Sequence, residues 1–131
     1  SVDKGEALRK LEPLVEQATE IGSQIADWFD AFERGELDEQ TLMSRVRAVS
    51  PEVKAITDQA VDLPFPPQDV EDYDARAQSL FCHLGNMALY YSKRGVETWP
   101  EERRRLVLMR FTVKDFGADL QRLEFEREKL R

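Results

Sequence analysis

Apolar residues recur along most of this chain at alternating intervals of four and three residues. A mean interval of 3.5 residues keeps one side of an α-helix apolar, whereas a half-buried strand alternates at every second residue. Within residues 8–34 the pattern comprises Leu8, Leu11, Val15, Ala18, Gly22, Ile25, Phe29 and Phe32. The spacing therefore predicts a long amphipathic helix that packs against other helices along one seam.

Three further stretches repeat this pattern. Residues 38–62 carry it at Leu42, Val46, Val49, Val53, Ile56, Ala60 and, just beyond, Leu63. Residues 69–94 carry it at Val70, Tyr73, Ala77, Leu80, Leu84, Met87 and Tyr91, and residues 99–128 at Leu106, Met109, Val113, Phe116, Leu120 and Leu123. Four such stretches with short connections predict an all-α fold, an antiparallel up-down-up-down four-helix bundle that forms one domain over residues 1–131.

The helix boundaries follow from capping residues. Gly35 stands where a helix C-terminus needs a residue with positive φ, and Asp38 is typical of a helix N-cap. Pro13 either begins the first helix or kinks its first turn. Ser50–Pro51 resembles a helix start, yet the apolar register does not slip across it, so we expect one helix kinked at Pro51.

The stretch "DLPFPPQD", residues 62–69, is the clearest break in the helical pattern. We expect it to be a stiff connection, with Phe65 covering the end of the core. Pro64 and Pro67 also match the loose P-x-x-P pattern of polyproline ligands, which leaves a peptide-like binding role open.

Charge and cysteine content restrict the function. The net charge is −7, and the excess of acidic residues lies in the first half of the chain. An acidic protein without a basic face disfavours nucleic-acid binding, and it suits a basic protein partner. The single cysteine excludes an internal disulfide and favours a reducing, cytoplasmic location. No apolar run approaches the roughly 20 residues of a membrane span, and the first residues lack the apolar core of a signal peptide.

The third and fourth predicted helices carry a second apolar row, which points away from their seams. The row comprises Cys82, Leu89 and Tyr90 on the third helix and Val107, Phe111, Ala118 and Phe125 on the fourth. Because an apolar row outside a bundle usually marks an interface, it predicts a homodimer. The alternative is a wide bundle in which these two helices are central.

His83 is the only histidine of the chain. A structural zinc site needs four N or S ligands, and one His beside one Cys does not supply them, so we expect no metal and no cofactor. An acidic helical bundle with one histidine, here in "CHLGNMA", is similar in architecture to histidine phosphotransfer domains. That family places Lys three residues and Gly four residues after the histidine, where this chain has Asn86 and Met87.

Arg76 and His83 have six residues between them and share one side of the third predicted helix. This spacing resembles that of the nucleotide-binding HEPN family, whose ribonucleases are helical bundles with an Arg and a His at the site. The resemblance implies acid–base chemistry by His83 and phosphate contact by Arg76. The residue after the arginine, usually polar in that family, is Ala77 in this chain.

The sequence therefore favours a non-enzymatic protein–protein interaction module that acts as a homodimer and binds a further protein. Adaptor, chaperone, immunity factor and regulatory subunit remain open. The alternatives are a HEPN-like ribonuclease or nucleotide-binding bundle that uses Arg76 and His83, and a phosphotransfer bundle that uses His83.

Overall fold

The computed structural model describes residues 2–88 and 101–131, with the backbone alone at Glu101, Glu102 and Arg104. It contains the helices α1 (Lys4–Glu33), α2 (Glu39–Val61), α3 (Glu71–Ala88) and α4 (Glu101–Leu130), and a 3₁₀ turn η1 (Gln68–Val70). Helices account for 88 % of the described residues, and these include no strand, which confirms the all-α prediction. The predicted helix boundaries at residues 94 and 99, and Tyr91 of the third seam, lie outside the described residues.

Capping interactions set the bounds of α1. The helix begins at Lys4 rather than at residue 8, because the Asp3 carboxylate accepts a hydrogen bond of 2.8 Å from the Glu6 N–H. At its other end Gly35 has φ 78°, a conformation that side chains with a Cβ rarely adopt. The Glu36 N–H reaches back to the Ala31 carbonyl at 2.9 Å, so α1 ends in a Schellman turn, as Gly35 predicts.

The second helix begins and continues as its sequence predicts. The Asp38 carboxylate accepts a 2.7 Å hydrogen bond from the Thr41 N–H, and this bond lowers the pKa of Asp38. Pro51 lies inside α2, so Ser50–Pro51 does not begin a new helix. Pro13 likewise lies inside α1.

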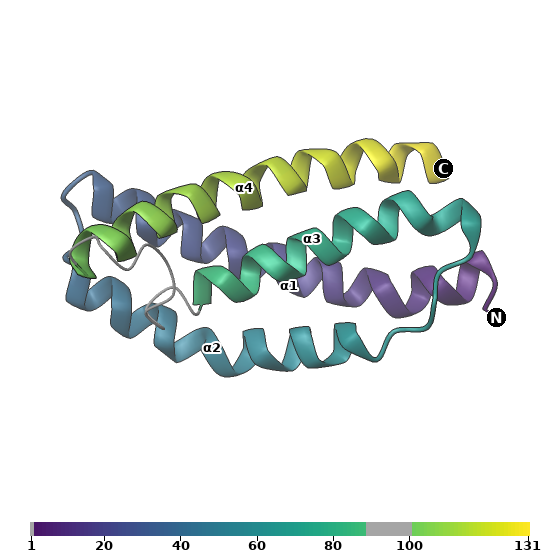
Figure 1. The fold of residues 1–131 in the computed structure, drawn as a ribbon, viewed down its shortest axis with the longest axis horizontal. Helices are drawn as coiled ribbons and strands as arrows, with labels where there is room; N and C mark the ends of the chain where they lie inside the picture. Colours follow the sequence, from purple (N-terminus) through teal and green to yellow (C-terminus); the bar gives the residue numbers. More distant parts are fainter. Residues whose placement is uncertain (1, 89–100) are drawn as a thin grey trace.

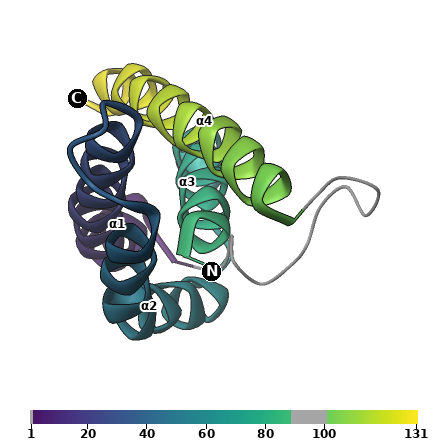
Figure 2. The same cartoon turned by 90° about the vertical axis from the view of Figure 1, so that its left-hand side faces the viewer.

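The helix α3 is the central element of the described bundle, because it packs more extensively against the other three helices than any of them does (Figure 2). Figure 1 shows the N-terminus and the C-terminus at the same end of the molecule. One buried cluster joins all four helices, and its largest members include Phe29, Leu42, Tyr73, Leu80, Met109 and Phe116. These residues belong to the heptad seams that the sequence predicts.

The fourth helix packs closely against α1 at Gly22. This residue is buried, and a Cβ added to it would overlap the ring of Phe116 from α4. The aromatic ring therefore occupies the space that any side chain at position 22 would need. Gly117, also inside a helix, has nothing within 4 Å of an added Cβ.

A polar network lies beside the core and links three helices. The Tyr73 hydroxyl of α3 donates to Glu12 of α1 and accepts a 3.0 Å hydrogen bond from Arg127 of α4. Burial, followed by the hydrogen bond to Glu12, raises the pKa of Tyr73. The phenol consequently stays protonated and acts as a donor.

The segment between α2 and η1 corrects one prediction. Phe65 does not cover the end of the core, because its exposed fraction is 89 %. Val70 is buried there, and Leu63 packs against the core in its place. Phe65 has a proline on each side, and the following Pro67 is extended at φ −67° and ψ 159°.

Two of the helical glycines, Gly22 and Gly117, predict opposite effects on stability. We expect Gly22→Ala to lower the free energy of unfolding by about 1–3 kcal/mol, since its methyl group collides with Phe116. Gly117→Ala should raise it by about 0.5–1 kcal/mol, because alanine favours the helix and nothing opposes the methyl group. Urea unfolding followed by circular dichroism measures both changes. A stabilised Gly22→Ala variant would contradict the close packing.

Candidate functional site

Asp119 of α4 is fully buried, and no other charged residue in the described part of the chain is buried. The Ser79 hydroxyl of α3 donates to its Oδ1 at 3.0 Å, and His83 of α3 bonds to its Oδ2 through Nδ1. The guanidinium of Arg122 lies 3.8 Å from Oδ1. A buried carboxylate is stable only when such donors replace the water it has lost. Asp119 therefore ties α4 to α3 at a defined axial position.

The same hydrogen bond determines what His83 can do. Because a carboxylate accepts and does not donate, Nδ1 carries the proton and Nε2 of the neutral ring keeps its lone pair. The side chain is 26 % exposed, and Nε2 lies 3.9 Å from Asp115. An oriented imidazole of this kind is able to act as a base.

A serine, a histidine and an aspartate meet here, but not in the order of a nucleophilic triad. In such a triad the serine gives its proton to the histidine, which the aspartate orients. Here Ser79 donates directly to Asp119, at 3.0 and 3.2 Å from the two carboxylate oxygens. This geometry stabilises the carboxylate and leaves Ser79 without a base, so the cluster does not support nucleophilic catalysis by serine.

Arg76 is exposed and lies seven residues before His83 on α3. Seven residues advance a helix by about 10.5 Å and return almost to the same side. The two residues therefore share a face, as the sequence predicts, without lying in contact along the helix. A ligand such as a phosphodiester would have to extend between them.

Asp119 is not among the site residues that the sequence pattern predicts. The sequence nevertheless indicates that Asp119 lies close to the core, because it follows Phe116 by three residues and precedes Leu123 by four. These are the same intervals that define the seam, so a carboxylate is placed at the edge of an apolar row. The donors on α3 come from a distant part of the chain, which periodicity alone cannot pair.

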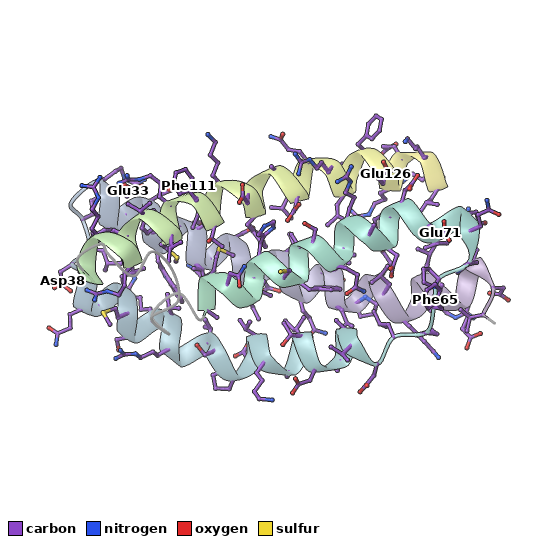
Figure 3. The ribbon with its side chains drawn as sticks, viewed as in Figure 1. Glu33, Asp38, Phe65, Glu71, Phe111 and Glu126 are labelled. Carbon is purple, nitrogen blue, oxygen red and sulfur yellow. The ribbon has the colours of Figure 1, made fainter. Side chains whose placement is uncertain are left out.

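The second apolar row is only partly described. Phe111 and Phe125 of α4 are 60 % and 64 % exposed, Cys82 is exposed, and Val107 and Ala118 are half-buried. Leu89 and Tyr90 lie outside the described residues. Figure 3 places Phe111 near Glu33 at one end of the bundle and Phe65 at the other end. The ammonium of Lys129 lies 4.4 Å from the ring centre of Phe125.

A shallow groove of about 340 Å³ lies between α1 and α2. Its lining mixes the carboxylates of Glu20 and Glu52 with apolar Ile21 and Val49. None of the residues that carry the alternative functions, Arg76 and His83, belongs to it.

The described residues provide neither a metal-binding cluster nor a helix that could span a membrane. Within residues 2–88 and 101–131, no three His, Cys, Asp or Glu side chains form a group able to hold a metal ion. None of the helices described has the length and apolar character needed to cross a bilayer.

Comparisons with protein-family models, with curated proteins and with solved structures find no match for this chain. Its function therefore has to be argued from its own residues.

The buried carboxylate predicts a strong and local effect on stability. We expect Asp119→Ala to lower the free energy of unfolding by about 1–3 kcal/mol, because Ser79 and His83 lose their acceptor in a buried place. Asp115→Ala, which removes an exposed carboxylate from the same helix, should change it by less than about 0.5 kcal/mol. Urea unfolding compares the two variants. Equal losses of unfolding free energy in the two variants would contradict a special stabilising role of buried Asp119.

Proposed function

We propose that this protein is a non-enzymatic protein–protein interaction module that acts as a homodimer of helical bundles. The observation that carries the proposal is the exposure of two large aromatic side chains, Phe111 and Phe125, on one face of α4. They are fourteen residues apart, which is about four helical turns, so they share that face at a separation of about 21 Å. Covering each ring would contribute about 1.5–3 kcal/mol, a gain that only a docked partner provides.

The proposal includes a finer architecture for the subunit. It is an antiparallel up-down-up-down bundle with α2 kinked at Pro51. The position of both chain ends at one end of the molecule supports this topology (Figure 1). Pro51 supports the kink, because it lacks an N–H and its ring crowds the preceding turn.

The protein acts in the cytoplasm and binds a second, different protein as an adaptor, chaperone, immunity factor or regulatory subunit. The single cysteine, Cys82, is exposed, and a free exposed thiol suits a reducing compartment. The net charge of −7 suits a basic protein partner rather than nucleic acid.

One observation favours an enzymatic alternative. The hydrogen bond from His83 to buried Asp119 leaves Nε2 as an oriented base beside solvent. A ribonuclease of the HEPN kind would use this base, with Arg76 on the same face of α3 to bind a phosphate. The same nitrogen would accept the phosphoryl group in a histidine phosphotransfer bundle.

Self-association tests the main proposal. We expect the wild-type protein to dimerise in sedimentation equilibrium, and we expect the double variant Phe111→Ser, Phe125→Ser to stay monomeric, because its α4 face is no longer apolar. Phe65→Ser is the matched control, since Phe65 is even more exposed than the two α4 rings but lies on the connection before η1. A wild-type protein that remains monomeric at about millimolar concentration would overturn the proposal.

His83→Ala discriminates between binding and catalysis. If the protein is a binding module, it should show no ribonuclease activity on a single-stranded RNA, with or without His83. Loss of a measurable RNA cleavage in His83→Ala and in Arg76→Ala, with sedimentation unchanged, would replace the binding proposal by the ribonuclease. Phosphoramidate, which transfers phosphoryl groups to histidine, tests the phosphotransfer alternative by intact mass.

A further inference from the structure

We infer that the second copy docks antiparallel on α4, with the two-fold axis of the dimer passing beside Ala118. This inference rests on the proposed function and adds the register of the interface. Its basis is that the outer face of α4 is self-complementary: its apolar, small and charged residues each meet a suitable partner when the helix is reversed about one point.

The apolar residues define that point. Phe111 and Phe125 lie seven residues before and after Ala118, so each ring lies about 10.5 Å from it along the helix. Reversal about Ala118 brings Phe111 of one subunit opposite Phe125 of the partner subunit. By symmetry, Phe125 of the first subunit lies opposite Phe111 of the partner subunit. Two equivalent aromatic contacts result, which is the property of an isologous two-fold interface.

Small residues at the centre permit the approach. Ala118 has only a methyl group, and Gly117 beside it has nothing within 4 Å of the position of a Cβ. The distance between packed helices depends on the side chains at the contact, and it is shortest where these are small. Two copies of α4 are thus able to meet at their midpoints while the rings above and below cover one another.

The exposed charges on this face are complementary in the antiparallel register. Asp115 and Arg122 are 60 % and 57 % exposed, and their contacts within the chain are long, 3.9 Å to His83 and 3.8 Å to Asp119. Asp115 lies three residues before Ala118 and Arg122 four residues after it, and both lie on the same edge of this face. Reversal about Ala118 therefore brings Asp115 to within one residue of the level of Arg122 of the partner subunit, and two such ion pairs can form.

The interface is expected to be weak on its own. A single helix face offers less area than the roughly 800 Å² per partner of a standard interface. We therefore expect a dimer dissociation constant in the micromolar range or above from this face, and measurements have to extend to higher protein concentrations.

A charge reversal tests the register. We expect Asp115→Arg and Arg122→Asp each to raise the dimer dissociation constant about tenfold or more, because like charges then face one another at two places. The double variant restores the opposite pairing and should return to within about threefold of the wild type. Lys54→Glu is the control, since this exposed lysine lies on α2 and not on the outer face of α4.

A cysteine cross-link gives an independent result. In a Cys82→Ser background, Ala118→Cys places two thiols beside the axis, so oxidation should join the subunits rapidly. Glu124→Cys is the control, because reversal about Ala118 separates the two copies of this position by about 18 Å along the helix. The register would be overturned if the wild-type protein dimerises but the double charge variant does not restore dimerisation and Ala118→Cys forms no cross-link. The homodimer itself would still be supported by that result. A monomeric wild-type protein would overturn both the register and the homodimer. The outer face of α4 would then be available to a different protein.

Discussion

The contact between Phe116 and the bare backbone at Gly22 is the constraint on which the position of α4 depends. The ring lies where a side chain at position 22 would be, so α4 meets α1 with one rotation and one height. Two residues along a helix correspond to about 200°. Burying Phe116 therefore turns Ala118 to the opposite side, in line with the exposed Phe111 and Phe125. The outer apolar face is a consequence of the inner packing.

The buried carboxylate of Asp119 also fixes the position of α4, through its contacts with α3. Asp119 accepts hydrogen bonds from Ser79 and His83, which both belong to the central helix α3. Apolar seams tolerate small shifts along their axis, whereas a buried carboxylate that loses its donors is costly. The hydrogen bonds thus oppose sliding of α4 on α3, and they also orient the imidazole. A structural role accounts for this cluster without a substrate, and it is compatible with binding as the function.

Much of this fold follows from the sequence because its helices obey local rules. The seams, the cap at Asp38 and the turn at Gly35 depend on residues within a few positions of one another. Phe65 and Asp119 show where those rules stop. The exposure of Phe65 depends on whether Leu63 and Val70 already fill the end of the core. The role of Asp119 depends on donors about 40 and 36 residues away.

By itself, the sequence determined the number of helices, which side of each is apolar, and that α4 has a second apolar row. Those properties follow from helical periodicity, which needs no knowledge of neighbouring helices. Only the tertiary structure decided that α3 is central, that Phe116 meets Gly22, and that Asp119 is buried between its donors. The reason is physical: a heptad pattern leaves the rotation and the axial offset between helices free, and specific side-chain shapes and hydrogen bonds select one arrangement.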